Sequence, residues 1–143
     1  MGSIDHYLDA SFLVALLTAE PASSRATSFV STHSAGLIVS DFAAAEFASA
    51  ISRHVRMGHL PRSEGQSVLS AFDRWALTAV GNAETSPSDI ALAASFLRHL
   101  DLVLRTPDAI HIAVAQRLAA TLITFDRRMA DASRALRIPV IEP

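Results

Sequence analysis

The stretch Leu122-Ile123-Thr124-Phe125-Asp126-Arg127-Arg128 combines a short apolar run, an acidic residue and the start of a charged segment. The apolar run 122–125 is typical of a buried strand that ends at Asp126. Residues 127–136 then show the spacing of a helix. A buried strand that leads directly into a helix is typical of an α/β protein.

The same order of strand, acid and helix occurs near the beginning of the chain. There, His6-Tyr7-Leu8 is followed by Asp9 and by a helical pattern that starts near Ser11. Hydrophobic periodicity and turn residues extend this interpretation along the chain. We predict strands over residues 6–8, 37–39, 75–80, 122–125 and 138–141. We predict further helices over residues 24–33, 42–57, 63–74, 90–99 and 127–136, and one that opens with Thr106 as its N-cap.

Strands separated by helices require crossover connections, which favour parallel strands. We therefore expect a mostly parallel central sheet with helices on both faces, in a single domain spanning residues 1–143. Pro139 places the last strand near a sheet edge. Apolar residues on the predicted helices, namely Phe29, Phe42, Phe47 and Ile51, favour the core over an interface.

The composition excludes several classes of protein. The chain has 143 residues, 50% of them hydrophobic, and a formal net charge of -2, as expected of a folded domain. It contains no cysteine and no lysine, since all 12 basic residues are arginines, so thiolate metal sites and lysine-dependent enzymes are excluded. No membrane span or signal peptide is visible, and we expect a cytoplasmic protein.

Four acidic residues occupy positions that surface acids rarely take. Asp9 and Asp126 follow strands, where parallel sheets bind ligands, although an aspartate there can equally be a helix cap. Glu46 lies about 40° from Phe42 on a helical wheel and so falls within an apolar face. Its alternative is a salt bridge to an arginine, and His54 on the same face is interpreted as a packing residue. Asp108 lies in a first helical turn, where the helix dipole favours an acid.

Converging carboxylates would repel one another without a cation. Hard oxygen ligands in a chain without cysteine suit Mg²⁺, with Mn²⁺ as an alternative. Such a site suits phosphodiester hydrolysis, because the metal polarises phosphoryl oxygens and lowers the pKa of a bound water.

Four segments in order resemble the PIN-domain ribonucleases, specifically the VapC-type toxins of toxin–antitoxin systems. They are YLDAS (7–11), VSDFAAAE (39–46), RTPDAIHIA (105–113) and LITFDRR (122–128). The resemblance implies a metal-dependent endoribonuclease whose catalytic and metal-binding residues are Asp9, Glu46, Asp108 and Asp126. It places Ser11 and Thr124 beside the metal, where their alternatives are a helix cap and a strand residue. It further implies an RNA substrate, a homodimer and a cognate antitoxin whose tail enters the acidic groove.

Other residues near these motifs have weaker assignments. Arg105, Arg127 and Arg128 are candidates for RNA phosphate contacts, with ordinary solvated charge or a salt bridge to the acids as the alternative. With a net charge of -2, RNA affinity should be modest unless arginines cluster. Asp131 is interpreted as a solvent-facing helix residue and Asp41 as an N-cap.

Two other functions fit part of the pattern. The first is a catalytically silent PIN-fold module that binds RNA or an antitoxin, although an intact set of acids argues against it. The second is an aspartate-nucleophile phosphatase, which needs Asp-x-Asp after the first strand and a catalytic lysine. This chain has Asp9-Ala10-Ser11 and no lysine.

Overall fold

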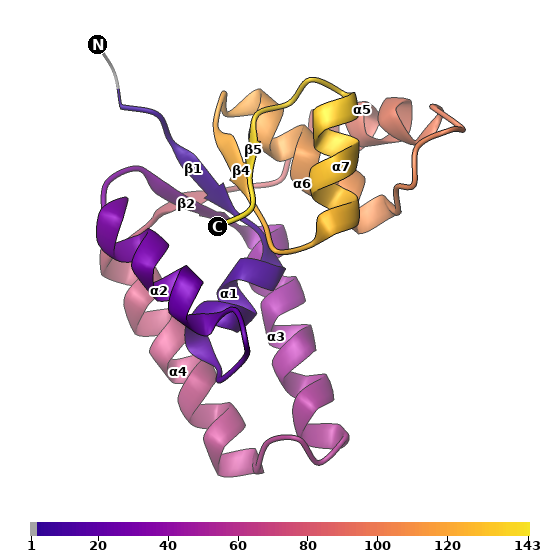
Figure 1. Ribbon diagram of the computed structural model, residues 1–143. Helices are drawn as coiled ribbons and strands as arrows, with labels where there is room; N and C mark the ends of the chain where they lie inside the picture. The colour runs from indigo at the N-terminus through magenta and orange to yellow at the C-terminus, as the bar shows by residue number, and fades with distance from the viewer. Residues whose placement is uncertain (1–2) are drawn as a thin grey trace.

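The computed structural model describes residues 3–143, which form seven helices and a five-stranded sheet (Figure 1). The strands are β1 (His6–Leu8), β2 (Leu37–Ser40), β3 (Gly81–Ala83), β4 (Thr121–Ile123) and β5 (Val140–Ile141). The helices are α1 (Ala10–Leu17), α2 (Ser23–Thr32), α3 (Asp41–Arg56), α4 (Arg62–Thr78), α5 (Pro87–Leu97), α6 (Thr106–Arg117) and α7 (Arg127–Ala135). The expected α/β class is confirmed.

All four strand pairings are parallel, and the strand order is β3-β2-β1-β4-β5. The chain first builds the sheet outward from β1 to β3 and then returns to add β4 on the other side of β1. The order therefore reverses between β1 and β4. At such a switch point the connections leave to opposite faces of the sheet, which opens a crevice at the carboxyl ends of the strands.

Alternating side chains divide the core between the two faces of the sheet. Tyr7 and Leu122 pack with α5, α6 and α7, whereas Leu8 and Ile123 pack with α1 to α4. The two groups of helices stand on opposite sides of the sheet in Figure 1. The expected helices on both faces are thus confirmed. The apolar helix residues Phe29, Phe47 and Ile51 are buried in the second core, as expected, and Phe42 is partly buried against the first.

The third strand lies later in the chain than the sequence predicted. Residues 75–80 do not form it, because α4 continues to Thr78 and places Trp75 against Phe72 in the core. The strand is instead Gly81–Ala83, paired with β2. A strand of small and polar residues has none of the β-branched side chains by which strands are recognised.

Two predicted helix caps are also corrected. Ser40, not Asp41, is the N-cap of α3, since its hydroxyl accepts the Ala43 N–H at 3.0 Å. Asp41 is the first helical residue, and its carboxylate accepts hydrogen bonds from the backbone and hydroxyl of Thr85. At α6 the cap is Arg105 and Thr106 lies within the helix.

The last strand is the edge strand that Pro139 predicted, although it is only two residues long. Of the helices within residues 3–143, none is long and apolar enough to cross a membrane.

Candidate active site

A groove of about 570 Å³ opens at the carboxyl ends of β1 and β4. Its lining includes all four acids that the sequence singled out, Asp9, Glu46, Asp108 and Asp126. They come from the end of β1, the second turn of α3, the first turn of α6 and the end of β4. The fold thus gathers four carboxylates from distant parts of the chain at the switch point of the sheet.

Asp9 is the most deeply buried of these acids, with 1% of its surface exposed. Its carboxylate caps α1 by accepting the Phe12 N–H at 2.9 Å. It also accepts the hydroxyl protons of Ser11 at 2.7 Å and Thr124 at 2.6 Å. Burial raises the pKa of Asp9, although the nearby His111 and these hydrogen bonds act in the opposite direction. Asp9 makes no ion pair with any residue in the described range.

Asp126 caps the next helix in the same way. Its Oδ1 accepts the backbone N–H groups of Arg128 at 2.9 Å and Met129 at 3.2 Å. The Thr124 hydroxyl accepts the Asp126 N–H at 2.9 Å and donates to Asp9, so one residue joins the two strand ends. Asp9 and Asp126 are therefore both helix caps and groove residues, and the two interpretations of the sequence are compatible.

Glu46 does not pair with an arginine, which was the alternative taken from the sequence. Its carboxylate hydrogen-bonds instead to Nε2 of His111 on α6, 65 residues away. The histidine side chain is 1% exposed, whereas that of Glu46 is 31% exposed to the groove. A buried imidazole thus holds the inner side of a carboxylate whose other side faces solvent.

The hydrogen bonding continues from His111 into the core. His111 Nδ1 lies 2.7 Å from the Tyr7 hydroxyl, which lies 2.7 Å from the Ser40 hydroxyl. We assign the His111 proton to Nε2, because donation in the order Ser40, Tyr7, His111, Glu46 then leaves every group paired. Burial raises the pKa of Tyr7, which keeps its hydroxyl proton available for donation.

The sequence did not single out Tyr7, Ser40 or His111 as site residues. One feature of the sequence could have identified His111 as a site residue. It follows Asp108 by three positions and therefore lies on the same face of the helix. A polar side chain between Ile110 and Ile112 is a candidate for a buried hydrogen-bonded position. Its partners on two other elements become visible only in the folded chain.

Asp108 is 3% exposed and accepts the backbone N–H of Arg105 at 3.2 Å. The Arg105 guanidinium Nε lies 3.6 Å from the same carboxylate oxygen, but that side chain is 71% exposed. Such an exposed, loosely paired guanidinium contributes little to stability and can turn toward an anion in the groove.

The charged residues around the groove differ in part from those expected. Arg105 lines the groove, together with Arg53 and His54 of α3, whereas the exposed Arg127 and Arg128 are absent from its described lining. His54 is partly buried and meets the His59 ring edge-on, with 5.6 Å between the ring centroids. On α7, Asp131 is exposed and pairs with Arg134 at 3.2 Å, in agreement with its solvent-facing assignment.

The oxygen-rich donor set suits a hard divalent cation, and Asp9 is a buried carboxylate without a cationic partner. Each acid is nevertheless held by its own neighbours. Within residues 3–143, no group of three or more histidine, aspartate or glutamate side chains stands in an arrangement that could already hold a metal ion. The chemistry of the donors fits a cation, and binding one would require these side chains to shift toward it.

Residues 6–135 match the family model described as the PIN domain. Ribonuclease VapC46 of Mycobacterium tuberculosis is 33% identical over 140 residues, which cover 96% of this chain and 96% of that protein. The crystal structure of M. tuberculosis VapC20, a sarcin-ricin loop cleaving toxin, matches with a TM-score of 0.74 at 18% identity, covering 90% of this chain and 95% of that one. A toxin–antitoxin complex from Klebsiella pneumoniae matches with a TM-score of 0.67 at 19% identity, covering 97% of this chain and 98% of that one. The family model and the full-length similarity to a VapC ribonuclease show that this chain belongs to the PIN-domain family.

Proposed function

We propose that this chain is a divalent-metal-dependent endoribonuclease that acts as the toxin of a toxin–antitoxin pair. The observation that carries the proposal is the gathering of four carboxylates in one groove at the switch point between β1 and β4. The similarity to a ribonuclease of the VapC group supports the reaction type.

In this proposal, Asp9, Glu46, Asp108 and Asp126 hold the cation, which is Mg²⁺ with Mn²⁺ as the alternative. When bound, the cation supplies charge for the phosphoryl oxygens and lowers the pKa of a water. The hydroxyls of Ser11 and Thr124 hold the Asp9 carboxylate in place through the hydrogen bonds described above.

The other polar residues have supporting roles. His111 positions the Glu46 carboxylate through its Nε2 proton. Arg105 at the groove edge is the first candidate for a contact with an RNA phosphate, because a guanidinium can bind phosphate through two parallel hydrogen bonds. Arg127 and Arg128, at the start of α7, remain candidates for contacts further along the strand.

We also propose that the chain is one domain, forms a homodimer and is inhibited by a cognate antitoxin. The shared sheet between the two cores supports a single domain. The toxin–antitoxin complex from K. pneumoniae has the same fold and supports a protein partner for this one.

Cleavage of a mixed pool of structured and unstructured RNAs tests the nuclease proposal. The purified chain would be assayed with Mg²⁺, with Mn²⁺ and with chelator, beside Asp9→Asn and Asp131→Asn. Asparagine can still cap α1 but removes the charge, so we expect Asp9→Asn to lose more than about a hundredfold in rate. Asp131→Asn is the matched control, since that carboxylate is exposed on α7.

Four outcomes decide between the alternatives. Undiminished cutting by Asp9→Asn would remove the acidic groove from the mechanism, and cutting in chelator would remove the metal. RNA binding without turnover, by a chain shown to be free of a second polypeptide, would favour the catalytically silent module. Metal-dependent cutting that is absent from Asp9→Asn and present in Asp131→Asn is the result we expect.

A further inference from the structure

The turn between α3 and α4, with the helix ends on either side of it, carries positive charge. Residues 47–63 contain no aspartate or glutamate, yet they include Arg53, Arg56 and Arg62. All three arginines are exposed, and none makes an ion pair within residues 3–143. We refer to these three residues as the basic hairpin.

Three arginines elsewhere in the fold have acidic partners, whereas six others make no ion pair within residues 3–143, namely Arg25, Arg74, Arg98, Arg127, Arg128 and Arg137. Arg117 pairs with Asp89 at 2.8 Å, and Arg134 pairs with both Asp131 and Glu142. Arg105 lies beside Asp108 at the groove. The guanidinium groups of the basic hairpin make no ion pair, although that of Arg56 donates to the Ser52 hydroxyl at 2.6 Å. They differ from the unpaired Arg127 and Arg128 because the hairpin reaches the groove lining through Arg53.

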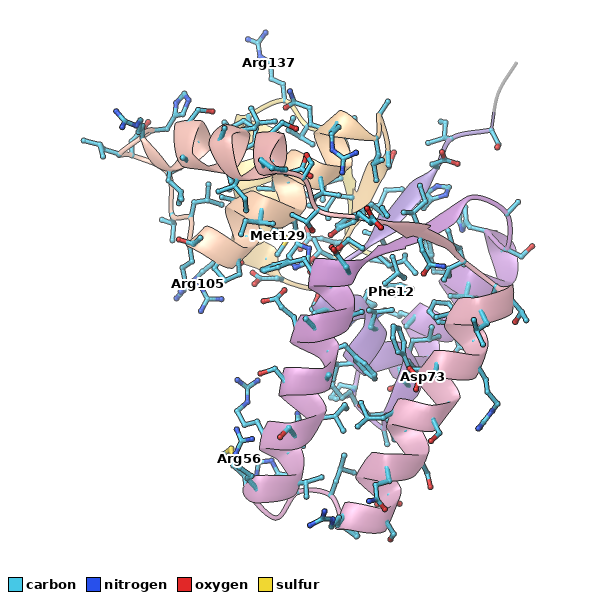
Figure 2. The ribbon with its side chains drawn as sticks, turned by 180° about the vertical axis from the view of Figure 1, so that it is seen from behind. Phe12, Arg56, Asp73, Arg105, Met129 and Arg137 are labelled. Atoms are coloured by element: carbon cyan, nitrogen blue, oxygen red, sulfur yellow. The ribbon has the colours of Figure 1, made fainter. Side chains whose placement is uncertain are left out.

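The basic hairpin is continuous with the acidic groove. The α3 face that carries Glu46 also carries Arg53 and His54, and all three line the groove. At 100° per residue, Arg53 lies about 20° and Arg56 about 80° around the helix from Glu46. The rise of about 1.5 Å per residue places Arg56 roughly 15 Å beyond Glu46 along the helix. Figure 2 shows Arg56 on the same side of the molecule as Arg105.

Close packing holds the hairpin in one shape. Gly58 turns the chain with a φ of +77°, and the following His59 N–H bonds to the His54 carbonyl at 2.8 Å. The two helices approach closely at Gly65, where an added Cβ would lie 2.6 Å from the Val55 Cγ2. The arginines thus stand on a preformed scaffold, which lowers the entropy cost of binding.

We propose that the basic hairpin binds backbone phosphates of the RNA strand outside the cleavage groove. The inference rests on the proposed ribonuclease function and names a second part of its substrate site. Three guanidinium groups on one helical hairpin would release counterions from the strand and supply affinity that does not depend on base sequence. They would give a chain of net charge -2 a local attraction for a polyanion.

The salt dependence of RNA binding tests this assignment. The probe is a fluorescein-labelled single-stranded RNA of mixed sequence, titrated with the Asp9→Asn chain so that cleavage does not interfere. A triple variant, Arg53→Gln, Arg56→Gln and Arg62→Gln, would be compared with Arg137→Gln in the same background. Arg137 is an exposed arginine at the opposite end of the molecule in Figure 2.

We expect the slope of log K against log salt to become shallower by about 2 in the triple variant, at roughly 0.7 per phosphate contact on a single strand. Between 50 and 200 mM salt, the unsubstituted background would therefore lose about 15-fold more affinity than the triple variant. The Arg137→Gln slope should equal that of the background. Each single substitution should produce about a third of the change.

Equal slopes for the triple variant and Arg137→Gln would overturn the proposal. This is also the result expected if the basic hairpin binds a protein partner and not RNA. A thermal melt of each variant excludes unfolding as the cause of a change. Failure of the ribonuclease function is a different result, because it appears as absent cleavage by the unsubstituted chain. The slopes report RNA contact whether or not the chain cuts.

Discussion

Two aspartates at helix N-termini, Asp9 and Asp89, are equally buried at 1% exposure but have different partners. Asp89 accepts two hydrogen bonds from the Arg117 guanidinium, at 2.8 and 2.9 Å, and the Ser86 N–H at 2.8 Å. Asp9 accepts only hydroxyl and amide hydrogens. Burial acts to raise the pKa of both. The bonds from Arg117 and Ser86 nevertheless lower that of Asp89, whereas that of Asp9 is raised.

The difference separates a carboxylate that is paired with an arginine from one for which we propose a bound cation. Arg117 is the last residue of α6 and ties that helix to α5 through Asp89. Asp108, in the first turn of the same helix, faces the groove. At the C-terminal end of α6, Arg117 neutralises the charge of Asp89. At its N-terminal end, Asp108 contributes to a groove whose negative charge is largely uncompensated by side chains within residues 3–143.

Among substitutions outside the four acids, the largest effect on cleavage is expected from Tyr7→Phe. Tyr7→Phe leaves His111 Nδ1 without its donor and weakens the hold on Glu46. Loss of a partner that orients a metal ligand typically costs 10- to 100-fold in activity or metal affinity. Tyr7 acts on Glu46 only through His111, so we expect a fall in cleavage rate near the lower end of that range, with a matching rise in the Mg²⁺ concentration that gives half-maximal cleavage.

Ser133→Ala is the control for Tyr7→Phe, because it removes a buried hydroxyl that bonds to the Met129 carbonyl within α7. It should leave the half-maximal Mg²⁺ concentration unchanged. If Tyr7→Phe lowers stability but leaves that concentration unchanged, Tyr7 has a packing role and the positioning of Glu46 does not depend on it.

The next effect compares the two buried aspartates directly. Asp89→Asn weakens a charge-assisted pair, and we expect it to lower the free energy of unfolding by about 1–3 kcal/mol. The lower end applies because the Arg117 side chain is 35% exposed and partly screened by solvent. Asp9→Asn removes a buried charge without a cation, so stability should be unchanged or higher. Urea denaturation without divalent cations measures both, and equal losses would refute the distinction.

The smallest expected effect is the change with pH in the contribution of Asp89 to the free energy of unfolding. Because the folded pKa of Asp89 lies below its unfolded value of about 3.9, its stabilisation is complete above that value and is lost as pH falls through the folded pKa. The difference in unfolding free energy between the unsubstituted chain and Asp89→Asn should therefore be constant from about pH 7 to 5. It should shrink below about pH 4.

Urea midpoints across this pH range give the measurement. The difference between the unsubstituted chain and Ser133→Ala serves as the reference, since neither serine nor alanine titrates there. A difference for Asp89→Asn that stays constant below pH 4 would mean that Asp89 is not held ionised by Arg117.

Local patterns in the sequence predicted much of this protein. The end of β1 is visible because its apolar run stops at Asp9, where α1 begins. The run 122–125 likewise stops at Asp126, where α7 begins, although β4 itself already ends at Ile123. Glu46 stood out because helical periodicity placed it on an apolar face, and Asp108 because it follows a proline in a first turn. Each of these inferences depends on neighbours within a few positions.

The tertiary structure determined the features that depend on contacts between residues far apart in the sequence. The sequence placed the third strand too early, because Gly81–Ala83 is a strand only through its pairing with β2. It also offered an arginine as the alternative partner of Glu46, whereas the fold supplies His111, 65 residues away in the sequence. Arg53 became a groove residue for the same reason. Local patterning therefore determined which elements form and which carboxylates end them, and long-range packing determined what those carboxylates meet.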